Sequence, residues 1–296
     1  MLNFSNTQKI NMINILVTGG NGQLGCSINE ISNWYSSYNI IFTDISKLDI
    51  SDFDSVNLFV LKNNINVIVN CAAYTAVDLA ETNISIANEI NHLSVINLAK
   101  IAKENNVKLI HISTDYVFDG NSSVPYKETD ITNPQSVYGK TKLDGELGLC
   151  HINPHNSIII RTSWLYSRYG NNFVKTILKI SENQNQINVV SDQFGTPTNA
   201  SDLASTILEI IPKINNKKVE IFHFSNKGVC SWYDFAKSIF SLGAKKIELG
   251  PASSDQFLTK AKRPLYSVLD KSKIINEFSL SIKNWDESLS NFFKNK

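Results

Sequence analysis

The chain has 296 residues and a mass of 33.1 kDa, and 42% of its residues are apolar, so it can bury a large core and is not a disordered chain. Its 28 Lys and Arg residues against 27 Asp and Glu residues give a net charge of +1, which argues against a nucleic-acid partner. No run reaches the ~18 apolar residues of a membrane span and the N-terminus does not resemble a signal peptide, so we expect a soluble cytoplasmic protein without a membrane partner.

The first half of the chain alternates short β-branched runs with stretches of helical length. Residues 1–12 are expected to form a tail outside the fold, with translation starting at Met1 or Met12. We expect strands at 13–17, 40–43, 67–70, 107–112 and 157–161, and helices at 23–35, 53–63, 83–104 and 138–150. Strand–helix–strand units at this spacing form right-handed crossovers and a parallel sheet. The sequence therefore predicts a doubly wound, Rossmann-like α/β fold with a dinucleotide-binding domain at 13–165.

The pattern becomes less regular after about residue 165. We expect helices near 171–184, 200–213, 231–242 and 285–293, a late strand at 219–224, and an irregular loop at 250–268. The segment 166–296 is therefore predicted to be mainly a smaller substrate-binding lobe, with some elements returning to the main sheet.

A glycine-rich turn follows the first strand directly. The segment 18–25 (TGGNGQLG) contains Gly19, Gly22 and Gly25. The first permits a tight turn, the second lets backbone amides approach a pyrophosphate, and the third lets the next helix pack on the strand. An ordinary glycine-rich turn is the alternative, but the flanking strand and helix favour a dinucleotide site.

Carboxylates after the second strand are candidates for the adenosine end of the cofactor. Asp44 follows the last glycine by about 20 residues, where a carboxylate grips a ribose diol and repels a 2′-phosphate, which favours NAD. The alternative is a helix cap or a turn. Asp49 is a further candidate for contact with the adenine, and the small residues of 70–75 close the third strand, as a cofactor lying on the backbone requires.

A tyrosine and a lysine open the helix predicted at 138–150. Tyr138 and Lys142 are four residues apart and share one helix face. A phenol is a poor acid–base catalyst at neutral pH unless a positive charge stabilises its phenolate, which the Lys142 ammonium can do. Thr114 ends the fourth strand, where its hydroxyl can hydrogen-bond a substrate carbonyl. The alternative is a chance pattern at a structural helix start.

Together these elements resemble the extended short-chain dehydrogenase/reductase superfamily. Further motifs narrow the resemblance to the dTDP-4-dehydrorhamnose reductase family, and they occur in family order from about residue 13 to 293. They are 22–25 (GQLG), 77–81 (VDLAE), 113–120 (STDYVFDG), 138–146 (YGKTKLDGE), 161–164 (RTSW), 170–173 (GNNF), 192–198 (DQFGTPT) and 263–264 (RP).

The resemblance implies reduction of the 4-keto group of dTDP-4-dehydro-L-rhamnose to dTDP-L-rhamnose, with NADPH or NADH as cofactor. This reaction serves nucleotide-sugar synthesis for cell-surface polysaccharide. Tyr138 would give its proton to the carbonyl oxygen, and Thr114 would polarise that carbonyl. Lys142 would hold the nicotinamide ribose and lower the pKa of the tyrosine. NADH is expected to be usable alongside NADPH.

The same resemblance implies a set of binding residues. The expected cofactor contacts are Gly22, Gln23 and Leu24 at the pyrophosphate, Asp44, Asp49 and Ile50 around the adenosine, and Ala73, Tyr74, Thr75 and Ile112 along the rest. The expected contacts of the dTDP-sugar are Thr114, Asp115 and Trp164, with Asn172 and Arg263 as further candidates because a diphosphate needs amide or cationic donors. The alternatives are a core aromatic role for Trp164 and an exposed surface position for Arg263.

A metal ion is not expected. Some family members bind Mg²⁺ with carboxylates at a dimer interface, but Ser27 and Ser201 occupy two of those positions here. Without the carboxylates a hard cation has too few oxygen ligands. The chain is therefore expected to bind no Mg²⁺, which makes a homodimer of that type doubtful and leaves the oligomeric state open. The four scattered cysteines favour reduced thiols over a disulfide framework or a zinc site.

Two other classes of function are alternatives. A non-catalytic regulatory subunit, like the relative that regulates methionine adenosyltransferase, would be favoured by loss of Tyr138, Lys142 or Trp164, and all three are present. A related sugar-nucleotide 4-epimerase or 4,6-dehydratase is the second. A dehydratase typically carries Asp-Glu after the threonine, whereas Tyr116 follows Asp115 here.

Overall fold

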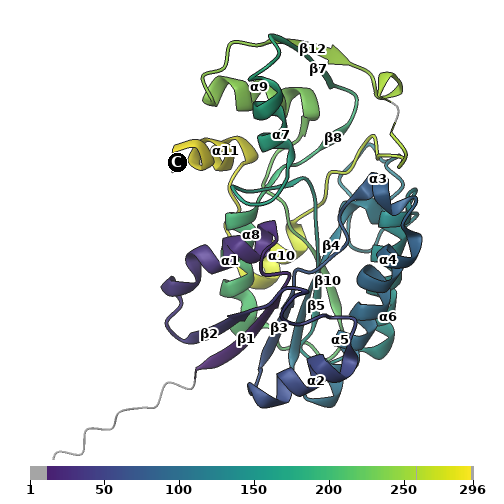
Figure 1. Cartoon of the computed structure of the whole chain (residues 1–296), viewed down its shortest axis with the longest axis vertical. Coiled ribbons are helices and arrows are strands. Elements are labelled where there is room, and N and C mark those ends of the chain that lie inside the picture. Colours follow the sequence, from purple (N-terminus) through teal and green to yellow (C-terminus); the bar gives the residue numbers. More distant parts are fainter. Residues whose placement is uncertain (1–11, 258, 295–296) are drawn as a thin grey trace, which may run out of the picture.

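A six-stranded parallel sheet forms the centre of the molecule, shown in Figure 1 as a computed structural model that describes residues 12–257 and 259–294. Most of the predicted 1–12 tail therefore lies outside the described residues. The sheet has the order β10-β5-β4-β3-β1-β2. Its strands are β1 (Ile13–Thr18), β2 (Tyr38–Phe42), β3 (Val67–Asn70), β4 (Lys108–Thr114), β5 (Ile158–Thr162) and β10 (Glu220–His223).

Helices cover both faces of this sheet (Figure 1). Successive side chains of a strand point to opposite faces, so Ile15 and Val17 pack with one set of helices and Leu16 with the other. The first set is α1 (Gln23–Ile31), α8 (Ala200–Ile210) and α10 (Ser272–Phe278), and the second is α2 (Phe53–Lys62), α5 (Ser94–Glu104) and α6 (Val137–Ile152). The doubly wound α/β prediction is confirmed.

The predicted helix at 83–104 is interrupted. It consists of α4 (Ile84–Asn88), a π-helical turn at Glu89–Leu93 and α5. The turn carries the buried Asn91, whose side chain accepts from the Tyr74 amide at 2.9 Å and donates to the Tyr74 carbonyl at 3.1 Å. The interruption therefore serves to hold the loop after β3, which is consistent with the frequent placement of π turns at functional sites.

The C-terminal half forms a second, smaller layer above the carboxyl ends of the strands (Figure 1). It contains α7 (Phe173–Ile180), β7 (Gln186–Val190), α9 (Trp232–Leu242), β12 (Glu248–Ala252) and α11 (Trp285–Lys294), with β7 and β12 paired in parallel. The predicted loop at 250–268 is wrong at its start, because residues 250–252 belong to β12. Pro251 is tolerated there because a two-stranded ribbon leaves one edge of each strand unpaired.

Several elements from residue 165 onward pack with the N-terminal part of the chain or lie at its junction with the C-terminal layer. β10 pairs with β5, and β6 (Leu165–Tyr166) pairs with β9 (Thr198–Asn199) directly before α8. The hydrophobic cluster around β1 contains Leu203 from α8 and Phe278 from α10. Among the described residues, no helix has both the length and the apolar character needed to cross a membrane.

Candidate active site

The glycine turn after β1 is packed too closely for side chains. Gly19 has a φ of +65°, and a Cβ atom on it would lie 2.7 Å from the Ala72 nitrogen. A Cβ on Gly25 would lie 2.5 Å from the Gly19 carbonyl oxygen. Gly22 is the N-cap of α1 and has no side chain to cap it, so the helix start presents backbone amides. The turn therefore fits the pyrophosphate of a dinucleotide.

Asp44 lies in a turn beside the glycine loop. Its Oδ1 accepts from the Ser46 hydroxyl at 2.7 Å and the Ser46 amide at 3.1 Å, and Asn21 of the glycine loop donates to Oδ2. The Ser46 hydrogen bond is the main cause that lowers the pKa of Asp44. The carboxylate is thus ionised and fixed at the edge of the predicted cofactor cradle.

Replacing Asp44 with alanine is expected to improve the use of NADPH relative to NADH, because the substitution removes a negative charge that repels a 2′-phosphate. The measurement is the ratio of kcat/KM for the two cofactors at fixed ionic strength. Asp52→Ala is a matched control, since Asp52 caps α2 in a similar way but lies outside the predicted adenosine contacts. An unchanged ratio in Asp44→Ala would show that this carboxylate does not contact the ribose.

The other predicted adenosine contacts lie in the next turn. Asp49 is exposed and accepts from the Ser51 amide at 2.9 Å and the Ser51 hydroxyl at 2.8 Å, while Ile50 is buried. On the third loop Ala73 and Tyr74 are half-buried and Thr75 is exposed. These contacts with the cofactor stay predictions.

Gln23 connects the cradle to the C-terminal half of the chain. Its Oε1 accepts from the Asn172 amide at 2.9 Å and from the Ser167 hydroxyl at 3.2 Å. Asn172 also caps α7 by accepting from the Lys175 amide at 3.1 Å, so its side chain is occupied by protein partners. The structure thus gives Asn172 a role in orienting Gln23, while its predicted contact with the diphosphate stays a prediction. The side chain of Leu24 is buried in the core, which leaves its backbone to face the cradle.

Tyr138 stands at the start of α6. Ser136 caps this helix by accepting from the Gly139 amide at 3.1 Å. A Cβ on Gly139 would lie 2.2 Å from the Tyr116 carbonyl oxygen, so the absence of a side chain lets the helix start press against the end of β4. The phenol rings of Tyr116 and Tyr138 meet edge to face at 5.6 Å.

This packing brings Tyr138 to Thr114 and Asp115. Desolvation raises the pKa of Tyr138 to about 12, and the charge of Asp115 adds to the rise. The nearby Thr114 hydroxyl opposes it, although its geometry does not complete a hydrogen bond with the phenol. The phenol is therefore protonated at neutral pH and is ready to donate. Lys142 is not among the causes, so its predicted lowering of the tyrosine pKa stays a prediction for the cofactor-bound protein.

The carboxyl group of Asp115 is buried at the end of β4 with one oxygen unpaired. Oδ1 accepts from the Thr114 hydroxyl at 3.1 Å, whereas Oδ2 has no hydrogen-bond partner among the described residues. Burial raises the pKa of Asp115 to about 6. The nearby Ser267 hydroxyl opposes that rise, although its geometry does not complete a hydrogen bond. An unpaired buried carboxyl oxygen calls for a partner, and a hydroxyl of a bound sugar would supply one.

Lys142 is buried and held against β4. Its Nζ donates to the Ile112 carbonyl at 2.6 Å and lies 3.4 Å from Nε2 of His111. Burial lowers the pKa of Lys142 to about 8, and the charge of Glu146 one turn later opposes this. Ile112 therefore meets the site through its carbonyl, a contact that the sequence did not predict.

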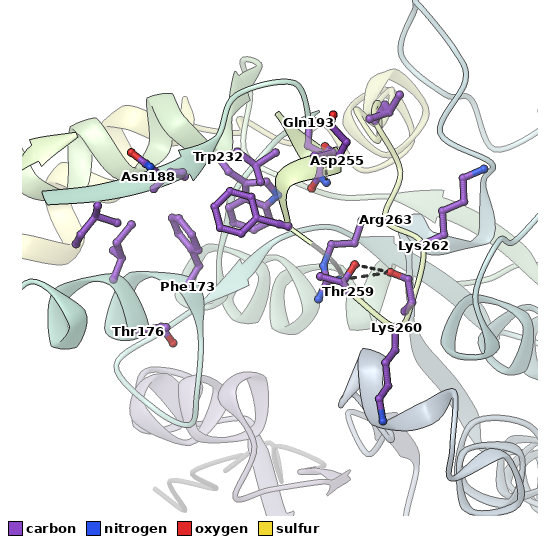
Figure 2. A pocket seen from close by; sticks show the side chains of 18 of the residues that line it. Phe173, Thr176, Asn188, Gln193, Trp232, Asp255, Thr259, Lys260, Lys262 and Arg263 are labelled. Carbon is purple, nitrogen blue, oxygen red and sulfur yellow. Dashed lines mark hydrogen bonds between the residues drawn. The ribbon is translucent and has the colours of Figure 1, made fainter. Parts of the chain in front are cut away.

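A cavity of about 710 Å³ lies beside the C-terminal layer (Figure 2). Phe173 and Trp232 line one side of it, and the 259–263 segment with Lys260, Lys262 and Arg263 lines the other. The apolar side can hold a flat ring and the basic side can attract an anion. A cavity of this size with an apolar wall and a basic rim can hold part of a sugar nucleotide. Its lining does not include Thr114, Asp115 or Tyr138.

Trp164 supports this cavity from behind. Its ring stacks on Trp232 with centroids 3.5 Å apart and planes within 8°, and a Cβ on Gly195 would lie 2.5 Å from the Trp164 ring. Trp232 lines the cavity and Trp164 does not. The sequence reasoning missed Trp232, for which the only signal was an aromatic at the start of an amphipathic helix. Direct contact of Trp164 with the substrate stays a prediction.

Arg263 is partly buried at the rim of the same cavity. Its guanidinium pairs with Asp78 of α3 (Val77–Ala80) through two contacts, at 2.7 Å and 3.3 Å. This pair lowers the pKa of Asp78 and joins the cavity loop to the helix layer. Arg263 also lines the cavity, and its Nη1 makes a further contact with the Ala261 carbonyl at 3.4 Å. Its predicted contact with a diphosphate stays a prediction.

The two serines at the candidate metal positions lie in one hollow of about 400 Å³ with Glu30 and Asp202. Ser27 donates to the Gln23 carbonyl at 2.9 Å, and the Ser201 amide donates to Asn199 at 2.9 Å. Within residues 12–257 and 259–294, no three His, Cys, Asp or Glu side chains form a ligand set. The expectation of a metal-free enzyme stays a prediction.

Comparison with known proteins decides the family. The family model described as the RmlD substrate binding domain matches residues 13–296. A dTDP-4-dehydrorhamnose reductase from Aggregatibacter actinomycetemcomitans is 42% identical over 289 residues, which cover 95% of this chain and 98% of that protein. The chain belongs to the dTDP-4-dehydrorhamnose reductase family. Its resemblance to that family, stated above from the motifs, is confirmed.

Solved structures of the family share this fold over almost the whole chain. A reductase of this name from Clostridium acetobutylicum is 42% identical with a TM-score of 0.90, covering 96% of this chain and 99% of that one. Another from Bacillus anthracis, in complex with NADP, is 37% identical with a TM-score of 0.91, and the match covers 96% of this chain and 100% of that one.

Proposed function

We propose that this protein is an NAD(P)H-dependent oxidoreductase that reduces the 4-keto group of dTDP-4-dehydro-L-rhamnose to give dTDP-L-rhamnose. One observation carries the proposal. Tyr138, Thr114 and Asp115 meet at the carboxyl end of β4, beside a glycine cradle that admits a pyrophosphate. Family membership over the full described fold supports the same activity.

The cofactor fits the cradle because Gly19, Gly22 and Gly25 leave backbone amides open to a pyrophosphate. When bound, it supplies the hydride for C4 of the sugar. Tyr138 then donates its phenolic proton to the carbonyl oxygen. The Thr114 hydroxyl, which donates to Asp115 Oδ1 in the free protein, turns to donate to the same oxygen, so negative charge that develops there is stabilised from two directions.

The remaining residues position the substrate. The Asp115 Oδ2 is free to accept from a sugar hydroxyl, which fixes the ring against β4. Trp232 and Phe173 give the nucleotide an apolar wall, and Arg263 offers its guanidinium to the diphosphate. Lys142 is placed to bind the nicotinamide ribose from the helix face that also carries Tyr138.

The dehydratase alternative is weakened by Tyr116. A dehydratase needs a second acid–base group at that position, but the Tyr116 phenol is half-buried and desolvation raises its pKa. The regulatory alternative is weakened because Tyr138, Lys142 and Thr114 are all present and the Thr114 hydroxyl is near enough to the Tyr138 phenol to act on its pKa.

The direct test is an assay of the purified protein with the 4-keto sugar nucleotide, following loss of absorbance of NADH and NADPH separately. Oxidation of either cofactor with formation of dTDP-L-rhamnose supports the proposal. Binding of both cofactors without their consumption would favour the regulatory alternative. Oxidation of a cofactor with formation of a product of different configuration at C4 would mean that the protein is a related 4-keto reductase.

Activity is expected to survive exhaustive chelation, because Ser27 and Ser201 stand where carboxylates would be needed to hold a cation. The measurement is turnover after dialysis against EDTA, compared with the same sample supplemented with Mg²⁺. Activity that is lost on chelation and restored by Mg²⁺ would contradict this prediction.

A further inference from the structure

A chain of buried polar groups crosses the sheet behind the predicted catalytic residues. The Thr18 hydroxyl, one residue before Gly19, donates to Asn70 Oδ1 at 2.6 Å. Asn70 Nδ2 lies 3.0 Å from Nδ1 of His111, and Nε2 of His111 lies 3.4 Å from Lys142 Nζ. All four side chains are buried. This series of polar side chains therefore links β1, which leads into the glycine turn, with Lys142 on α6.

The donor and acceptor roles in this chain follow from one backbone group. The Ala72 amide can only donate, and it points at Asn70 Oδ1 at 3.2 Å. Because that atom must be the oxygen, the atom facing His111 is the amide nitrogen, which donates to Nδ1. Burial keeps the pKa of His111 well below its ordinary value, so the ring is neutral and its single proton sits on Nε2.

We propose that His111 is a positioning residue that presents its Nε2–H to Lys142 Nζ and thereby favours release of a proton from the Lys142 ammonium. An N–H group pointing at an ammonium is an unfavourable contact between two donors, whereas the same group pointing at a neutral amine makes a hydrogen bond. This inference rests on the proposed function only where it concerns the pH dependence of the reaction. The effect on Lys142 itself is a property of the free protein.

The other groups around Lys142 act on its charge in known directions. The Ile112 carbonyl accepts from Nζ in either protonation state, and the negative charge of Glu146 favours the ammonium. Burial raises the pKa of the Cys71 thiol to about 12, so this neighbour is neutral where Lys142 titrates. His111 is therefore the neighbour that works with desolvation against the charged form. Lys142 carries its charge below its pKa and loses it as the pH rises.

A second buried histidine provides an internal comparison. Nδ1 of His223 lies 3.1 Å from the Tyr126 carbonyl, which can only accept, and its Nε2 lies 3.5 Å from the Arg161 guanidinium, which can only donate. His223 must therefore carry its proton on Nδ1. The two buried histidines are assigned opposite tautomers.

The first test needs no substitution in the network. Long-range ¹H–¹⁵N correlation spectra of the ¹⁵N-histidine-labelled protein distinguish the two neutral tautomers and the imidazolium. Among the five histidines, we expect one pH-independent Nε2–H ring from His111 and one Nδ1–H ring from His223. The His111 signal is assigned by its loss in His111→Gln. A proton on Nδ1 of His111, or a charged ring at neutral pH, would overturn the proposal.

The second test measures Lys142 directly in the cofactor-free protein. Lysine labelled with ¹³C at Cε is titrated by NMR, and the Lys142 signal is assigned by its absence in Lys142→Arg. His111→Asn keeps an acceptor for Asn70 but removes the donor facing Lys142, whereas His111→Gln places an amide N–H near the lost Nε2–H. We expect the Lys142 pKa to rise by about one unit in His111→Asn and to return toward the wild-type value in His111→Gln.

Equal Lys142 titrations in the three proteins, or equal shifts in the two variants, would reduce His111 to a structural residue and overturn the proposal. Far-UV circular dichroism and thermal unfolding confirm that each variant is folded. Because neither NMR test uses substrate or cofactor, failure of the proposed reductase activity leaves both results interpretable. Where the activity is present, the alkaline limb of kcat/KM should move upward by the same amount in His111→Asn only.

Discussion

Tyr138→Phe is expected to lower turnover by about 10²–10⁴-fold, the usual contribution of a positioned proton donor. The substitution removes one oxygen and keeps the ring that packs against Tyr116, so the fold and the cofactor cradle should be unchanged. The measurement is kcat with the 4-keto sugar nucleotide, alongside the Kd for NADPH and the thermal midpoint as controls. Near-normal turnover would mean that the proton comes from another group.

Substitutions of two neighbouring residues allow the losses of turnover to be ranked. Thr114→Val keeps the shape of the side chain and removes one of two donors to the same oxygen, so it should cost less than Tyr138→Phe. Lys142→Met should weaken both cofactor binding and turnover, because we assign this lysine to the ribose and to the tyrosine. A larger loss from Thr114→Val than from Tyr138→Phe would reverse the assigned roles.

Glu146→Gln is expected to reduce the free energy of unfolding by about 3–5 kcal/mol, as is usual when one partner of a buried ion pair is removed. The Glu146 carboxylate accepts from Arg161 at 2.6, 3.0 and 3.1 Å, and both side chains are almost wholly buried. The guanidinium also lies over the Phe118 ring at 5.1 Å. The variant leaves that positive charge in the core without its counter-ion.

Asp144→Asn is the matched control on the same helix. Asp144 pairs with Lys140 at 3.2 Å across the exposed face of α6, and such surface pairs contribute about 0–1 kcal/mol. Urea unfolding of both variants, followed by circular dichroism, gives the two free energies. Similar small losses in both proteins would show that water or rearrangement compensates for the buried charge.

The N-terminal half was predictable because its strands are buried on both faces and therefore appear as unbroken β-branched runs, such as Ile158–Ile160. The pairing of β7 with β12 was not, because Gly250 and Pro251 interrupt the second strand and neither residue favours a sheet. The π turn around Asn91 was also hidden, since its apolar spacing differs little from that of a continuous helix.

Within the candidate site, residue spacing could place only residues that share one element, and the pairing of Thr114 with Tyr138 came from the resemblance to a family. Tyr138 and Lys142 share a helix face by their spacing alone. The stacking of Trp164 on Trp232 and the bond between Gln23 and Asn172 join segments far apart in the chain, and local patterns contain no information about them. The same is true of His111, whose importance depends on which atom of Asn70 faces it.

The position of β10 has a consequence for how the molecule is made. During synthesis the nascent chain completes β5 well before β10 emerges, so the run Ile158–Ile160 waits as an uncovered edge strand with unpaired amides. Of the two helices that close the core beside β1, α8 emerges between β5 and β10, and α10 emerges only after β10. A fragment ending near residue 165 would keep that edge open and would tend to self-associate. The N-terminal half is therefore not a module that can be separated from the rest. An exchange of C-terminal halves between relatives would require that β10 of the new half pairs with β5 of the old one.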